Sequence, residues 1–173
     1  AELPRLLEGV AFVFHLAGVN RPQDPQEFVT GNADLTAALV EAVEGEMRAR
    51  GRKIAIVCTS STQAARDNPY GASKRAAEEV LRAFAARTGA AAHVFRLPNV
   101  FGKWCRPNYN SAVATFCHNM ARGLPIQIND PAALVTLVYV DDVVERFIQL
   151  MDGADAAVDA EGFATVTPQY TTT

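Results

Sequence analysis

The stretch KIAIVCTSSTQAARDNPYGASKRAAEE, residues 53–79, contains a strand, a polar turn and the first half of a helix. Residues 53–59 are a short apolar run of strand type, which the polar letters TSST close. Residues 70–87 follow with helical periodicity, and their inner stripe is Ala77, Val80, Leu81 and Phe84. Two solvent-side charged pairs are predicted on this helix, Arg75–Glu79 and Glu78–Arg82. The stretch therefore predicts one strand–turn–helix unit.

Strands and helices alternate in the rest of the chain as well. We expect further strands at residues 10–16, 92–97 and 134–140. Further helices are expected at residues 32–50, 111–122 and 141–151, the last capped by Asp141 or Asp142. This alternation predicts an α/β fold, a parallel sheet with helices on both faces. Sites in such sheets lie at the carboxyl ends of the strands, where AGVN, TSST and PNVFG stand here.

Composition excludes several classes of protein. The chain has 173 residues, a net charge of −3 and a pI near 5.6, which gives no electrostatic footprint for nucleic acid. Its longest apolar stretch, VAFVFHLAGV, is too short to span a membrane, and no signal peptide is visible. Three widely spaced cysteines fit neither a disulfide framework nor a zinc site. We therefore expect a cytoplasmic protein with no metal site.

A tyrosine stands four residues before a lysine in the helix predicted over residues 70–87. Side chains at this spacing share a helix face, and a nearby ammonium lowers the pKa of a phenol. Tyr70 and Lys74 can therefore pass a proton to or from a sugar or alcohol oxygen. Ser61, and after it Thr62, would supply a hydroxyl that orients this oxygen. The alternative is an aromatic and a charge that only share a helix face.

The motifs HLAGVN, TSST, YGASK, RLPNVFG and YVDDVV stand in an order and spacing that resembles the extended short-chain dehydrogenase/reductase superfamily. The resemblance covers residues 9–151 and implies a Rossmann-type, nucleotide-sugar enzyme. The stretches HLAGVNRP, QAARDNPYGASK and FGKWCRPNYN look like the capsule and O-antigen reductases of the UDP-N-acetyl-L-fucosamine pathway. Those enzymes reduce the 4-keto group of a UDP-2-acetamido-2,6-dideoxy sugar with NADPH.

The resemblance also implies roles for single residues. Tyr70 would protonate the 4-oxygen, Lys74 would bind the nicotinamide ribose and Ser61 would hydrogen-bond the same oxygen. The implied cofactor contacts further include Leu16, Ala17, Gly18, Ser60 and Pro98. The implied substrate contacts are Asn99, which would meet the diphosphate or sugar, and Thr62.

Other polar residues are candidate substrate contacts from their chemistry alone. Cations can neutralise a diphosphate, and amides can bind sugar hydroxyls, although both are also common at surfaces and in turns. The candidates are Arg96, Lys103, Arg106, Asn20, Arg21, Asn108 and Asn110. His118 with Cys105 is an acid/base alternative to a structural histidine, whereas Trp104, Cys58 and Cys117 are expected to be packed.

Two features of the resembling family are missing. The chain lacks the Gly-x-x-Gly-x-x-Gly loop that cradles a pyrophosphate, and it lacks the cupin-like metal-binding domain of the similar reductases. We therefore expect residues 1–173 to be a partial NAD(P)-binding domain, with its core at residues 9–151, from a longer protein. By analogy, a homodimer is expected.

Competing functions use the same fold. A 4,6-dehydratase needs two carboxylates after the catalytic hydroxyl, and Thr62 and Gln63 do not provide them. A 4-epimerase that retains NAD is not separated from an NADPH-dependent reductase by these motifs. A non-catalytic cofactor-binding module is a third interpretation, which the presence of Ser61, Tyr70 and Lys74 disfavours.

Overall fold

The structure, a computed structural model, describes residues 2–172 and divides into two compact units. The first unit extends to Arg96 and includes Val158–Thr165. The second unit contains Leu97–Ala157 and the residues that follow Thr165. In residues 2–172, no helix is long and apolar enough to cross a bilayer.

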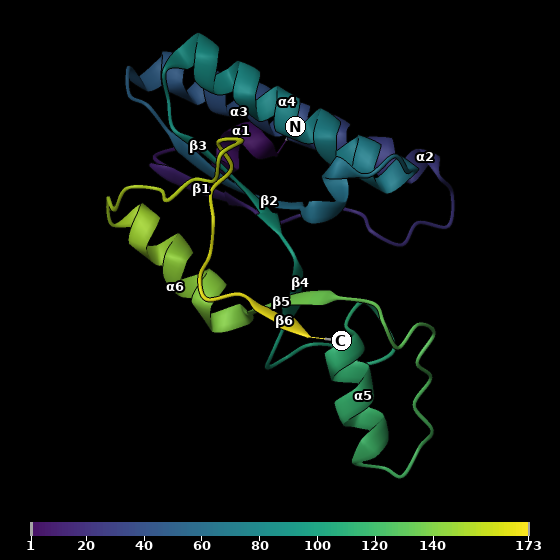
Figure 1. Cartoon of the computed structure of the whole chain (residues 1–173). Helices are drawn as coiled ribbons and strands as arrows, with labels where there is room; N and C mark the ends of the chain where they lie inside the picture. The colour runs from purple at the N-terminus through teal and green to yellow at the C-terminus, as the bar shows by residue number, and fades with distance from the viewer. Residues whose placement is uncertain (1, 173) are drawn as a thin grey trace. The chain divides into compact units, whose positions relative to one another are not determined.

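The first unit is built on a three-stranded sheet with the order β1–β2–β3. Strand β1 (Phe12–His15) runs parallel to β2 (Ala55–Ser61), and β3 (Ala92–Leu97) lies on the other side of β2. Helices α3 (Leu35–Arg50) and α4 (Pro69–Thr88) lie side by side on one face of the sheet (Figure 1). The short elements are α1 (Leu3–Leu6), α2 (Gln26–Phe28), a π-helix (Val29–Asp34) and a 3₁₀ turn (Thr62–Ala65).

Local chemistry explains the bounds of α4. The Asn68 side chain accepts a hydrogen bond from the Gly71 amide at 2.8 Å, and Pro69 occupies the first turn. Gly89 ends the helix in the left-handed region, with φ of 62°. The inner stripe then packs on the sheet, because Leu81 and Phe84 are fully buried. This places Tyr70 at the start of α4, near the carboxyl end of β2.

The second unit has its own three-stranded sheet, β4–β5–β6. Strand β4 (Asn99–Phe101) is parallel to β5 (Val135–Tyr139), which is antiparallel to β6 (Tyr170–Thr172). Helices α5 (Ala112–Met120) and α6 (Val140–Met151) complete this unit. The buried side of α6 consists of Val143, Phe147 and Leu150.

The expected α/β class is confirmed, and each predicted strand and helix is present within a few residues of its expected bounds. Three points differ. The strands form two sheets, and the three-residue strands β4 and β6 were not predicted. The prediction that Asp141 or Asp142 caps α6 is wrong, because Tyr139 is the N-cap and both aspartates lie inside the first turn. There they favour the helix by facing the positive end of its dipole.

Candidate active site

The expected catalytic residues meet in the first unit, where β2 ends and α4 begins. Tyr70 and Lys74 lie on one face of α4, and Ser61 is the last residue of β2. The Ser61 hydroxyl accepts a hydrogen bond from the Gln63 amide at 3.1 Å, which starts the 3₁₀ turn. The Lys74 ammonium is buried and donates to the Thr59 carbonyl at 2.8 Å. This hydrogen bond connects the end of β2 to the first turns of α4.

Two opposing effects act on the pKa of the Tyr70 phenol. Burial raises the pKa of Tyr70, and a side-chain hydrogen bond with Ser61 opposes the rise. The net direction is upward, so the predicted lowering of this pKa by Lys74 is wrong for this structure. The physical reason is that desolvation disfavours the phenolate, while the Lys74 ammonium bonds the Thr59 carbonyl. Tyr70 therefore keeps its proton at neutral pH.

The surroundings of Lys74 come from three elements. Burial lowers the pKa of Lys74, and Cys58 and Glu78 act in the opposite direction. Burial, and then the Lys74 charge, lower the pKa of His15, so the imidazole is neutral at pH 7. Burial raises the pKa of the Cys58 thiol to about 11, which makes it an inert core residue as expected. Lys74 thus lies beside the neutral side chains of His15 and Cys58, and the Glu78 carboxylate, which is ion-paired with Arg96, opposes its desolvation.

Asn32 is a residue of this site that the sequence analysis missed. It is 2% exposed and lies in the π-helix that precedes α3. Its side-chain oxygen accepts from the Val19 amide, and its side-chain nitrogen donates to the Val19 carbonyl and the Ser73 hydroxyl, each at 2.9 Å. Asn32 therefore joins the segment after β1 to α4. Its place at the start of an apolar helix pattern was the signal that could have identified it.

The segment that follows β1 supplies the other candidates of the first unit. Leu16, Ala17, Gly18, Asn20 and Arg21 are exposed along this segment. A Cβ atom at Gly18 would lie 2.7 Å from the Asn32 side-chain oxygen and 3.6 Å from the Lys74 nitrogen. A side chain at this position would therefore collide with Asn32, so the close approach of the backbone to Asn32 favours glycine.

Two predicted ligand contacts at the end of β2, Ser60 and Thr62, differ in their burial. Ser60 is buried, and its hydroxyl donates to the Glu78 carboxylate. Its side chain therefore faces the protein interior. Thr62 is exposed at the start of the 3₁₀ turn, where its side chain can meet a ligand.

The remaining candidates belong to the second unit. Lys103 forms an ion pair with Asp141 at 2.8 Å, which raises the pKa of Lys103. The Asn99 side chain donates to the Thr136 carbonyl at 3.3 Å, and the Asn108 amide donates to the Thr115 hydroxyl at 2.9 Å. The others are Pro98, which follows β3, and the exposed Arg106 and Asn110.

Two residues of the second unit, Trp104 and Cys117, were expected to be packed. The expected packing of Trp104 is wrong, because this side chain is 96% exposed on a residue with φ of 67°. Cys117 is exposed and not in the core, because no residue of α5 is buried. Within residues 2–172, no group of His, Cys, Asp or Glu side chains is arranged to hold a metal ion.

Gly71 sets the position of Tyr70 by permitting a close approach. A Cβ atom there would collide with the Gln63 carbonyl and lie 2.6 Å from the Arg66 carbonyl. Alanine is favoured over glycine in helices by about 1 kcal/mol, but a clash with backbone atoms costs about 1–3 kcal/mol. We expect Gly71→Ala to lower the midpoint of urea unfolding.

The matched control is Gly45→Ala in α3, where a Cβ atom meets nothing within 4 Å. This variant should be stabilised by about 0.5–1 kcal/mol, because glycine has the higher conformational entropy when unfolded. Equal midpoints for the two variants would contradict the close packing inferred at Gly71.

The chain is similar to proteins of one known family. The family model described as "NAD dependent epimerase/dehydratase family" matches residues 1–163. A UDP-2-acetamido-2,6-beta-L-arabino-hexul-4-ose reductase of Pseudomonas aeruginosa is 57% identical over 169 residues. That match includes 97% of this chain and 43% of the reductase. The chain thus spans less than half the length of this curated relative.

Solved structures also match this chain. The capsular polysaccharide assembling protein CapF of Staphylococcus aureus matches with a TM-score of 0.81 and 41% identity, over 98% of this chain and 44% of CapF. A UDP-glucuronic acid 4-epimerase of Bacillus cereus, in complex with UDP-glucuronic acid and NAD, matches with a TM-score of 0.75 and 21% identity. That match covers 90% of this chain and 54% of the epimerase, and it shows the fold alone.

Proposed function

The chain belongs to the NAD dependent epimerase/dehydratase family, and on that premise we propose that it is part of an NADPH-dependent nucleotide-sugar reductase. The proposed reaction reduces the 4-keto group of a UDP-2-acetamido-2,6-dideoxyhexose, in the synthesis of capsule or O-antigen. The observation that carries the proposal is the group of Ser61, Tyr70 and Lys74, with a hydrogen bond between the first two. The 57% identity to a UDP-hexulose reductase supports the substrate class.

The residues of the first unit suit a nicotinamide cofactor. Gly18 has no side chain and lies in the exposed segment after β1, where a ligand at the carboxyl end of the strand could approach the main chain. The family implies a nicotinamide dinucleotide, and we propose NADPH with NAD as the alternative. Leu16, Ala17 and Gly18 would lie under it, and Pro98 beside it. When bound, it supplies the hydride.

Each catalytic residue then has one task. Tyr70 donates its proton to the 4-oxygen as this oxygen gains negative charge, and a phenol that is protonated at neutral pH is in the correct state for this step. Ser61 hydrogen-bonds the same oxygen and orients it. Lys74 binds the nicotinamide ribose through its ammonium.

The rest of the proposal concerns the substrate and the assembly. We propose that the UDP-sugar contacts residues near the ends of strands and residues in the loop between β4 and α5. These are Asn20, Arg21, Thr62, Asn99, Lys103, Arg106, Asn108 and Asn110. We also propose a cytoplasmic homodimer whose full-length chain continues into a cupin-like domain.

The direct test offers the full-length protein a UDP-4-keto-6-deoxy-N-acetylhexosamine together with NADPH. We expect one NADPH to be oxidised for each sugar reduced. The loss of the near-ultraviolet absorbance of reduced nicotinamide measures this oxidation. Interconversion of UDP-sugars without NADPH consumption would instead assign the protein to the epimerases. A parallel assay with NADH measures the cofactor preference.

A further inference from the structure

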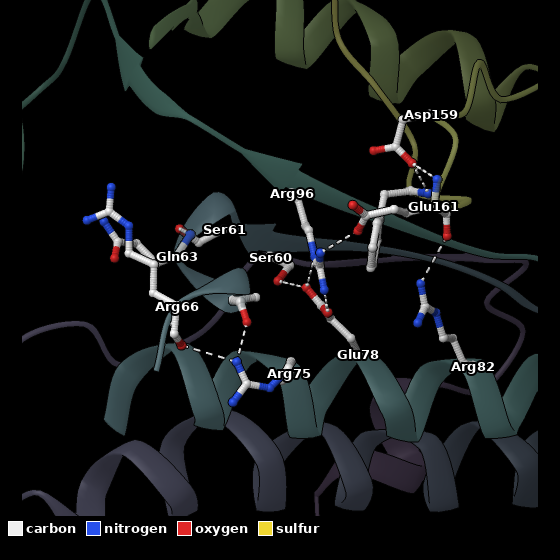
Figure 2. A network of polar contacts seen from close by, with 12 residues as sticks. Ser60, Ser61, Gln63, Arg66, Arg75, Glu78, Arg82, Arg96, Asp159 and Glu161 are labelled. Carbon is white, nitrogen blue, oxygen red and sulfur yellow. Dashed lines mark hydrogen bonds and ion pairs between the residues drawn. The ribbon is translucent and has the colours of Figure 1, made fainter. Parts of the chain in front are cut away.

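A buried acidic residue lies directly behind the candidate active site. Glu78 follows Lys74 by four residues on α4, and its side chain is 3% exposed. The predicted solvent-side pair with Arg82 is therefore wrong. The carboxylate accepts hydrogen bonds from the Ser60 hydroxyl and from Arg96, whose Nε and Nη2 lie 3.1 Å and 2.8 Å from its oxygens (Figure 2).

Arg96 is itself held by the segment Val158–Thr165. Its Nη1 lies 2.9 Å from a Glu161 carboxylate oxygen, and its guanidinium stacks on the buried Phe163 ring at 3.7 Å from the centroid. Asp159 shapes this turn by accepting hydrogen bonds from the Glu161 and Phe163 amides (Figure 2). The Arg96 donors are therefore engaged, which argues against its candidate role as a diphosphate ligand.

The geometry points to Glu78 as a positioning residue of the proposed active site: we infer that it fixes the strand end carrying Ser61 and places a buried carboxylate one helical turn from Lys74 on α4. Two observations support this inference, which rests on the proposed function. Ser60, which Glu78 binds, is the chain neighbour of Ser61. A two-point contact with a guanidinium holds a carboxylate in one orientation.

A purely stabilising role does not account for this arrangement. Buried ion pairs add little net stability, because desolvation of both charges cancels most of their attraction. A buried charge that faces a second ionisable group does alter the protonation of that group. Glu78 is buried one helical turn after Lys74 on α4, and after Cys58 it raises the pKa of Lys74 against the effect of burial.

The other groups that face Lys74 do not carry a compensating charge. His15 on β1 has a lowered pKa, and Cys58 on β2 has a pKa of about 11, so both are neutral at pH 7. Tyr70, on α4 itself, has a raised pKa and is neutral as well. The Thr59 carbonyl contributes only a dipole. Among these groups, Glu78 is therefore the carboxylate that we expect to oppose the effect of burial on the pKa of Lys74.

Titration of Lys74 tests this directly in the present chain, because the sequence contains only Lys53, Lys74 and Lys103. Lysine labelled with ¹³C at Cε gives three resonances, which single Lys→Arg substitutions assign. We expect Glu78→Gln to move the Lys74 titration to lower pH, while Lys53 and Lys103 titrate as before. The glutamine amide can still accept from Ser60 or Arg96, so the packing is largely retained.

The matched control is Glu79→Gln, the same change on the next residue of α4, which is exposed. It should leave the Lys74 titration unchanged. If Glu78→Gln unfolds the chain, the double variant Glu78→Gln with Arg96→Gln removes both charges of the pair and should give a smaller downward shift, because the loss of the Arg96 cation acts in the opposite direction. An unchanged Lys74 titration in a folded variant overturns the inference.

Activity separates this inference from the proposed function. In the full-length protein, Glu78→Gln should move the alkaline limb of the kcat/KM profile to lower pH, and Glu78→Asp should restore it. If the titration shifts but no keto sugar is reduced by the native protein, the reaction assignment fails and the role of Glu78 stands. If the native protein reduces the sugar and the titration does not shift, only the role of Glu78 fails.

Discussion

The Tyr70→Phe variant of the full-length protein should turn over a UDP-4-keto sugar about a hundred times more slowly or worse, since a positioned general acid contributes about 10²–10⁴-fold. The phenol forms a side-chain hydrogen bond with Ser61. Phenylalanine retains the ring that packs on Phe28, with centroids 5.7 Å apart, and removes only the hydroxyl. Steady-state NADPH oxidation measures the loss.

Binding distinguishes lost chemistry from lost structure in this variant. NADPH and the UDP-sugar should bind Tyr70→Phe nearly as tightly as they bind the native protein, because the ring stays in place. Phe28→Leu is the matched control, because it changes the packing of Tyr70 and keeps its hydroxyl. A Tyr70→Phe variant with native turnover would remove Tyr70 from the mechanism.

Strong local signals explain why α4 could be predicted from the sequence. Asn68, Pro69 and Gly89 each act on the backbone within their own turn, so the start and end of the helix do not depend on distant residues. The strands β4 and β6 have three residues each, too few for any periodicity to emerge. Their existence depends on pairing with β5, which is information that the local sequence does not contain.

The grouping of Ser61, Tyr70 and Lys74 could be predicted from the sequence, whereas the electrostatics of the group could not. Spacing on one helix face brought Tyr70 and Lys74 together, but the pKa of Tyr70 depends on burial by residues far away in sequence. Glu78 shows the same limit. Its spacing from Arg82 predicted a solvent-side pair, because its buried partner Arg96 and the segment Val158–Thr165 arrive only through the fold.

Lys74→Met should weaken NADPH binding to the full-length protein about 10- to 150-fold, because a hydrogen bond to a charged group contributes about 1.5–3 kcal/mol. Turnover should fall as well, since the side chain would no longer hold the nicotinamide ribose, and with it the cofactor, in position beside Tyr70. Isothermal titration calorimetry gives the affinity and NADPH oxidation gives the rate. Lys74→Arg, which keeps the charge on a different geometry, should be intermediate in both.

The stability of Lys74→Met shows whether such losses are specific. In the native chain, burial opposes the charge of Lys74, and this is why its pKa is lowered. Methionine fills the same space without a charge to desolvate, although the Thr59 carbonyl loses its 2.8 Å hydrogen bond. The two effects have opposite signs, so the midpoint of urea unfolding should change little. A variant that keeps native NADPH affinity and loses only sugar affinity would place Lys74 on the substrate, and a large loss of stability would make it a structural residue.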